Sequence, residues 1–186
     1  MKNYLILLFC LTLSPTTITS SKNVSDKTME EVYANFNKLS QDDKFKSHFS
    51  NFDIVKVKKL ISAILWQESA NGTLTHNPTE PSVGILQIQT SVVDDVNDFL
   101  NEKKYTYEDR NDPYKAIELF LYYQARYNPE LNIEKAARVW NGGPNGLDKT
   151  STISYWNKVK HWMNDEDSMK KSILHSLPIL QQNYQV

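Results

Sequence analysis

One glutamate stands where an amphipathic helix would bury it. Ile61, Ile64 and Leu65 recur at helical spacing, and Glu68 continues the same stripe near the end of the segment. Burial disfavours an ionised carboxylate and raises its pKa, and the negative end of the helix dipole acts in the same direction. A carboxylic acid that stays protonated near neutral pH can donate a proton to the leaving oxygen of a glycosidic bond. Glu68 is therefore a candidate general acid, against the alternative of a glutamate whose side chain reaches water.

Four short motifs follow one another along the chain and include this glutamate. They are Glu68-Ser69, then G-x-x-Q from Gly84 to Gln87, then Trp140-Asn141 followed by two glycines, and finally Y-x-x-x-V beginning at Tyr155. In this order and at these spacings they resemble the soluble lytic transglycosylase (SLT) domain family, over about residues 53–160. Each motif alone is common, and the order of all four carries the resemblance.

The resemblance implies a fold and a reaction. The expected fold is lysozyme-like and mainly α (in class terms α+β), a helical domain with a small irregular or β segment. The expected reaction cleaves peptidoglycan strands at the β-1,4 bond between N-acetylmuramic acid and N-acetylglucosamine. Glu68 would protonate the leaving oxygen, and the substrate's acetamido group would stabilise the cationic centre. Ionised Glu68 would then deprotonate the sugar's own 6-hydroxyl and close a 1,6-anhydro ring, with no cofactor.

The same resemblance assigns substrate-binding roles around the glutamate. Gly84 and Gln87 would line the cleft, and Asn141 would lie in it at the glycine turn. Tyr155 would position Glu68 or the sugar. The remaining two expected site residues are Ser69, for the helix end or the acetamido group, and Trp140. The family usually has tyrosine before the asparagine, so Trp140 can stack on a sugar but has no hydroxyl.

Two other functions remain open from the sequence. A hydrolytic lysozyme acting on the same bond would need a second carboxylate to hold or activate water, and Glu80, Asp94 and Asp95 are the candidates. These three are otherwise ordinary surface charges. A non-catalytic cell-wall-binding module would instead use a sugar-stacking surface built from the four tryptophans, Trp66, Trp140, Trp156 and Trp162.

Composition excludes several classes of function. The 186 residues carry 21 basic and 22 acidic side chains, a formal charge of −1, which argues against a nucleic-acid-binding surface. The only cysteine rules out a disulfide framework within the chain, and four scattered histidines give no metal-ligand spacing. We therefore expect no metal site, and the sequence gives no sign of a protein partner.

Helices must position these residues, and their periodicity predicts most of them. Asp53, Asp112 and Asn132 have the residue type and position of N-caps. The expected helices cover residues 27–40, 54–68, 91–100, 113–127, 133–140 and 152–163. Segments 41–51 and 103–111 read as polar loops, 71–81 as irregular, 84–89 as a short apolar turn or strand, and 141–146 as a tight glycine loop.

The chain divides into four parts on this interpretation. Residues 1–20, with one lysine, an uncharged apolar run containing Cys10 and small residues near Ser20, are typical of a secretory signal peptide. The run is too short to span a membrane, and no later stretch is long enough. Residues 21–52 form a lead and a helix, 53–163 the SLT-like domain, and 164–186 a tail. We expect an exported protein, periplasmic or extracellular, of bacterial or phage origin.

Overall fold

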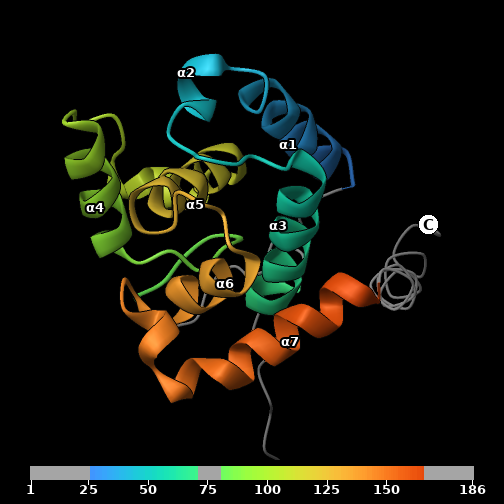
Figure 1. Cartoon of the computed structure of the whole chain (residues 1–186). Helices are drawn as coiled ribbons and strands as arrows, with labels where there is room; N and C mark the ends of the chain where they lie inside the picture. Colours follow the sequence, from blue (N-terminus) through green and yellow to red (C-terminus); the bar gives the residue numbers. More distant parts are fainter. Residues whose placement is uncertain (1–25, 71–80, 166–186) are drawn as a thin grey trace, which may run out of the picture.

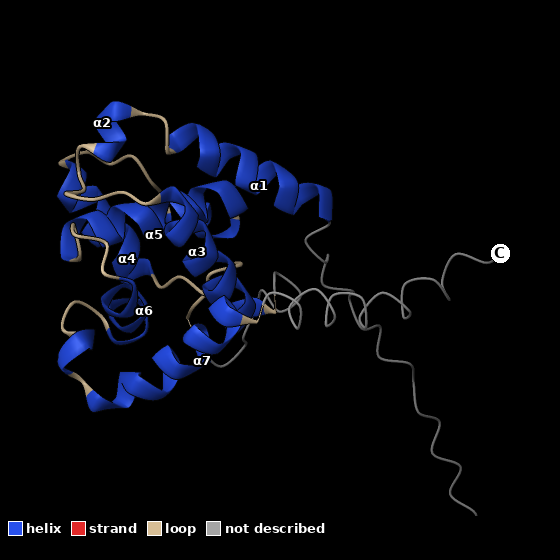
Figure 2. Cartoon of the chain, turned by 45° about the vertical axis from the view of Figure 1, so that its right-hand side comes forward, coloured by secondary structure: helices blue, strands red, loops and turns tan. Residues whose placement is uncertain are grey.

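The structure, a computed structural model, describes residues 26–70 and 81–165. The predicted signal peptide, the irregular segment 71–80 and all but the first two residues of the tail lie outside the described residues. Within the described part the fold is mainly helical, as predicted (Figure 2). The helices are α1 (Asp26–Leu39), α2 (Asp43–Lys46), α3 (Ile54–Ser69), α4 (Thr90–Leu100), α5 (Pro113–Tyr127), α6 (Ile133–Gly142) and α7 (Ile153–Asn164), with the 3-10 helices η1 (Tyr107–Asn111), η2 (Gly146–Asp148) and η3 (Thr150–Thr152).

Side-chain caps start three of the long helices where the sequence predicts them. The Asp53 carboxylate accepts hydrogen bonds from the first free N–H groups of α3, and Asp112 does the same for α5. The Asn132 side chain accepts from the backbone N–H of Lys135 at the start of α6. Each cap satisfies donors that have no partner inside the helix. The predicted helix boundaries are therefore confirmed at these three positions.

Three predicted loops are more ordered than expected. Segment 41–51 contains α2, which is capped by Asp42 and buries Phe45. Segment 103–111 contains η1, where Thr106 and Asp109 form a capping box. Helix α6 runs on through Gly142 into the expected glycine loop, and η2 begins at Gly146. Helices of three to five residues are too short to show a hydrophobic period, so periodicity alone misses them.

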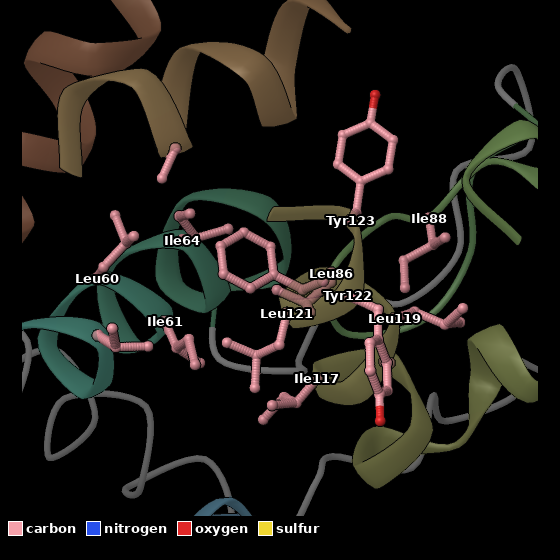
Figure 3. Packing of buried hydrophobic residues seen from close by; sticks show 14 of the residues in the cluster. Leu60, Ile61, Ile64, Leu86, Ile88, Ile117, Leu119, Leu121, Tyr122 and Tyr123 are labelled. Carbon is pink, nitrogen blue, oxygen red and sulfur yellow. The ribbon is translucent and has the colours of Figure 1, made fainter. Parts of the chain in front are cut away.

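Helix α5 is the centre of the molecule. Nine of its 15 residues are buried, and α1, α3, α4 and α6 lie around it (Figure 1). Leu60, Ile61 and Ile64 of α3 face the α5 residues Ile117 and Leu121 (Figure 3). Helix α7 crosses beneath α3 and α6 on the lower side in Figure 1 and contacts both. This arrangement brings the end of α3 close to the start of α7.

Residues 81–89, which we call the cleft loop, form a turn rather than a strand. An isolated antiparallel bridge between Val83 and Ile88 closes it, and Ile88 packs into the core with Leu86 (Figure 3). The Arg110 guanidinium of η1 donates to the carbonyl oxygens of Pro81 and Ile88 from outside. The small β segment expected from the sequence is thus reduced to one bridge in the described residues.

None of the helices in residues 26–70 and 81–165 is both long and apolar enough to cross a membrane.

Candidate active site

A cleft of about 740 Å³ opens where α3, the cleft loop and α6 meet. Four of the sequence-predicted site residues line it, namely Glu68, Gln87, Trp140 and Asn141. The other lining residues are Ser82, Ile88, Gln89, Ser91, Val92, Tyr123, Gly142, Gly143, Lys149, Ser151 and Thr152. The lining is mainly polar and uncharged, as a site for sugar hydroxyl and acetamido groups would be.

Glu68 is half-buried in the last turn of α3, as its position in the apolar stripe predicts. The Tyr155 hydroxyl donates a hydrogen bond to Glu68 Oε1 at 2.5 Å. Tyr155 is only 8% exposed, and burial, followed by the charge and hydrogen bond of Glu68, raises its pKa well above the usual value. The phenol therefore stays protonated and acts as a donor to the carboxylate. Tyr155 lies behind Glu68 and does not line the cleft.

Ser69 is fully buried and joins two elements of the site. Its hydroxyl lies 2.7 Å from the carbonyl oxygen of Ile85 and 3.1 Å from that of Leu65. It therefore ties the end of α3 to the cleft loop. Of the two roles expected for Ser69, support of the helix end fits this geometry, and contact with the substrate acetamido group does not.

Gly84 also lies behind the cleft surface, contrary to its expected place in the lining. Its φ of +77° is in the left-handed region, and an added Cβ would sit 2.0 Å from the carbonyl oxygen of Arg110. The position needs glycine for its backbone conformation and for this close approach. Gln87 does line the cleft, and its Nε2 donates to the Gly84 carbonyl oxygen at 2.8 Å, which fixes the amide.

Trp140 forms the aromatic part of the cleft wall. Its ring packs edge-on against Phe120 and Tyr123, with centroid separations of 4.9 and 5.8 Å. Among the described lining residues it is the only tryptophan. Trp66 and Trp162 instead pack against each other, 5.7 Å apart. The four tryptophans therefore do not form the shared stacking surface that a wall-binding module would use.

A family model described as Transglycosylase SLT domain matches residues 55–163, more than half of the chain. The chain belongs to the transglycosylase SLT domain family. The match runs from the first turn of α3 into the last turn of α7, so it includes the whole described cleft. Membership implies a peptidoglycan-acting function of the lytic transglycosylase type and a lysozyme-like fold. No curated protein and no solved structure matched the chain.

The SLT domain has one carboxylate among the described residues that line its cleft, Glu68. Asp94 accepts a hydrogen bond from the Tyr107 hydroxyl at 3.0 Å, outside the cleft. Asp95 pairs with Arg126 at 3.7 Å, also outside it. Glu80 lies outside the described residues. Two of the three carboxylates considered for water activation are therefore engaged elsewhere.

Tyr123 and Lys149 are two of the cleft-lining residues of the SLT domain that sequence reasoning missed. Tyr123 is 4% exposed and lies on the central helix α5, so its spacing predicts only a core residue. Its ring points to the opposite side from the ring of Tyr122 (Figure 3). Burial raises the pKa of Tyr123, so its hydroxyl stays protonated. Lys149 follows the glycine turn, where no pattern distinguishes it from other surface lysines. Only the folded position of the turn reveals it.

No group of His, Cys, Asp and Glu suited to holding a metal ion occurs in the part of the chain that the structure describes.

Proposed function

We propose that this protein is a lytic transglycosylase that cleaves the β-1,4 bond between N-acetylmuramic acid and N-acetylglucosamine, with Glu68 as the single acid and base. The observation that carries the proposal is the setting of Glu68. It lies half-buried at a helix end, accepts a hydrogen bond from a buried tyrosine and faces a cleft whose other described lining residues include no carboxylate.

The first step transfers a proton to the glycosidic oxygen. Tyr155 donates to Oε1, so we assign the acid proton of Glu68 to Oε2. As the bond between C1 and the leaving oxygen breaks, that oxygen takes the proton, and Glu68 becomes ionised. The acetamido oxygen of the muramic acid stabilises the positive charge at C1. It thereby takes the role that a second enzyme carboxylate has in a two-carboxylate glycosidase. Donation from Tyr155 stabilises the carboxylate that results.

The second step uses the same carboxylate as a base. Ionised Glu68 accepts the proton of the sugar's 6-hydroxyl while O6 forms a bond to C1. The product ends in a 1,6-anhydro ring, Glu68 is again protonated, and no water is consumed. A site with a single carboxylate suits these two reaction steps because each step needs only one proton donor or acceptor.

Product analysis tests the reaction. Purified peptidoglycan is digested with the protein, and the released fragments are analysed by mass spectrometry with and without borohydride reduction. We expect 1,6-anhydro ends, which resist reduction and are lighter by one water than hydrolysis products. Reducing ends would overturn the transglycosylase proposal and favour a lysozyme acting on the same bond.

A substitution of the proposed acid separates catalysis from binding. Glu68→Gln keeps the shape of the side chain and removes the acidic carboxyl proton, so we expect product release to fall by at least about 10³-fold. Glu108→Gln, an exposed glutamate outside the cleft, is the matched control and should act like the wild type. If the Glu68→Gln protein still solubilised the wall at the wild-type rate, the catalytic assignment would fail.

We also propose that the protein is exported to the periplasm or beyond the cell. The support is the signal-peptide pattern of residues 1–20 together with a family whose substrate lies outside the cytoplasm. Expression of the full chain with a C-terminal tag, followed by N-terminal sequencing of the exported product, should give a new terminus near residue 20. An exported or retained product that still begins at Met1 would contradict cleavage.

A further inference from the structure

The cleft contains a positive charge that the proposed reaction does not use. Lys149 lines the same cleft as Glu68, and its Nζ donates to the carbonyl oxygen of Gly142 at 2.6 Å. Among the described residues no carboxylate forms an ion pair with it. A lysine ammonium has three donors, so two N–H groups remain for a ligand after the bond to Gly142.

The surrounding turn holds Lys149 in place. Its backbone carbonyl oxygen accepts hydrogen bonds from Arg138 Nη2 at 3.0 Å and from Thr152 Oγ1 at 2.8 Å. Its side chain runs beside Gly142, where an added Cβ would be 3.5 Å from Lys149 Cδ. Lys149 is therefore held at both ends, at its backbone carbonyl oxygen and at its ammonium group. A ligand that binds the ammonium then has less side-chain entropy to remove.

The substrate class offers one kind of negative group to meet this charge. The sugar rings of a glycan strand are uncharged, but each muramic acid carries a lactyl arm. This arm ends either in a free carboxylate or in a peptide that itself bears carboxylates. A fixed ammonium and a carboxylate form a charge-assisted hydrogen bond, stronger than the neutral bonds available to the other lining groups except Glu68.

We infer that Lys149 forms a carboxylate-binding subsite, which recognises the acidic group carried by the lactyl arm of muramic acid. The inference rests on the proposed function, because it takes the glycan strand as the ligand of this cleft. It adds a reason why the cleft would select peptidoglycan over an uncharged polymer of N-acetylglucosamine.

Calorimetric binding to three soluble ligands tests the subsite. All proteins carry Glu68→Gln so that the ligands are not consumed. The ligands are peptide-bearing glycan strands, strands stripped of peptide by an amidase, and uncharged chitooligosaccharides of equal length. Adding Lys149→Met should weaken binding of the charged strands about tenfold, as expected for loss of a charge-assisted hydrogen bond, and change binding of the chitooligosaccharides less than twofold.

Two further variants serve as controls. Lys149→Arg retains the charge and should keep the affinity for the charged strands within about threefold of that of the parent, the Glu68→Gln protein with its native Lys149. Lys158→Met removes an exposed lysine of α7 that does not line the cleft, and it should leave all three affinities unchanged. The preference for charged strands should also weaken as salt is raised, because the subsite is exposed.

The outcomes separate the alternatives. A loss confined to stripped strands assigns the subsite to the lactyl carboxylate, which is free only there, and a loss confined to peptide-bearing strands assigns it to a peptide carboxylate. A loss with both kinds of strand means that the subsite accepts a carboxylate from either source. Equal losses for charged and uncharged ligands, no loss at all, or no binding of strands by the parent would overturn the inference. If the charged strands bind through Lys149 but the protein with its native Glu68 releases no fragments from peptidoglycan, the proposed reaction fails and the subsite remains supported.

Discussion

The pairing of Glu68 with Tyr155 defines the chemistry at the level of single residues. Tyr155 is buried and its pKa is raised well above the usual value, first by burial and then by the adjacent Glu68. Its proton therefore stays on the phenol throughout the pH range in which a carboxyl titrates. In the proposed mechanism Tyr155 is a positioning residue, which orients Glu68 and stabilises its ionised form, while Glu68 alone exchanges protons with the substrate.

Replacing Tyr155 by phenylalanine tests this division of roles. Tyr155→Phe keeps the ring in its buried place and removes the hydroxyl that donates to Oε1. A hydrogen bond to a charged group contributes roughly 1.5–3 kcal/mol, so we expect kcat to fall about tenfold or more. Because ionised Glu68 loses a donor, its protonated form should persist to higher pH. The alkaline limb of the activity profile should then move upward in pH.

The control for this prediction is Tyr107→Phe, which removes a hydroxyl bonded to Asp94 outside the cleft. It should leave both kcat and the pH profile as in the wild type. A Tyr155→Phe protein with reduced activity and an unshifted alkaline limb would mean that the tyrosine supports packing only.

Sequence reasoning predicted the residues of the site unevenly, for physical reasons. Glu68 follows from its place on a helical stripe, because periodicity reports which face of a helix is buried. Gly84 is expected in the cleft lining but lies behind it, and Ser69 fits only one of its two expected roles, support of the helix end, since a motif cannot distinguish a residue that touches substrate from one that holds the wall. Tyr123 and Lys149 gave no signal, because their places in the cleft depend on contacts between distant segments.

At the level of elements, two turns contribute to the lining of the cleft, and each is held by an arginine. Arg110 holds the cleft loop through the carbonyl oxygens of Pro81 and Ile88. Arg138 of α6, which is 8% exposed, holds residues 143–152 through Thr152 Oγ1 and the carbonyl oxygens of Leu147 and Lys149. Within residues 143–152 only Gly146 and Thr152 are buried, so polar contacts set the shape of that turn, whereas the cleft loop also buries Leu86 and Ile88 in the core.

Removing Arg138 should loosen the wall that carries Lys149. Arg138→Met removes the donor to Thr152 Oγ1 and to the carbonyl oxygens of Leu147 and Lys149, together with the ion pair to Glu134, so we expect the free energy of unfolding to fall by about 3 kcal/mol in urea titrations. The KM for peptidoglycan should rise more than kcat falls, because the loosened turn binds substrate and Glu68 lies on α3. Arg138→Lys should recover part of the loss, since an ammonium keeps the charge but cannot reach all three oxygens.

Lys135→Met is the matched control on the same helix, because Lys135 forms only an ion pair with the exposed Glu130. Its effect on the free energy of unfolding should stay within about 0.5 kcal/mol. Equal destabilisation by both substitutions would contradict the role given to Arg138.

The cleft loop should depend on glycine at position 84. Gly84→Ala places a Cβ 2.0 Å from the Arg110 carbonyl oxygen and strains a φ of +77°. We expect a loss of about 2 kcal/mol or more in the free energy of unfolding, measured by thermal and urea denaturation. Gly143→Ala also alters a glycine of positive φ, +79°, but meets no atom within 4 Å, so it should cost less. Equal losses would assign the whole effect to the backbone angle and none to the close approach.

The whole molecule extends beyond the part that the SLT family model matches. The match begins at residue 55, yet Val32 and Phe36 of α1 and Phe45 of α2 belong to the same buried cluster as α5. Phe45 is 2% exposed and packs edge-on against Phe49, Phe52 and Tyr122, with centroid separations of 5.4, 5.7 and 5.4 Å. The segment before the domain is thus part of the folding unit.

Truncating Phe45 should therefore destabilise the entire domain. Phe45→Ala should lower the free energy of unfolding by about 3–5 kcal/mol, the usual cost of emptying a buried aromatic site. Circular dichroism and tryptophan fluorescence should report one shared transition, because α2 and α5 share a core. Val55→Ala, at a position 62% exposed, should change stability by less than about 0.5 kcal/mol. Separate transitions for the two probes would mean that α1 and α2 form an independent unit.

The hydrogen bond between Glu68 and Tyr155 joins positions 87 residues apart. A ribosome makes Glu68 long before Tyr155, and domains organise from the N-terminus during synthesis. The acid therefore lacks its buried donor until α7 has been made and has docked beneath α3 and α6. An unfinished or unfolded chain carries every residue of the cleft loop and still has no assembled acid. Under the proposed function, wall cutting therefore begins only after α7 has folded against α3 and placed Tyr155 beside Glu68.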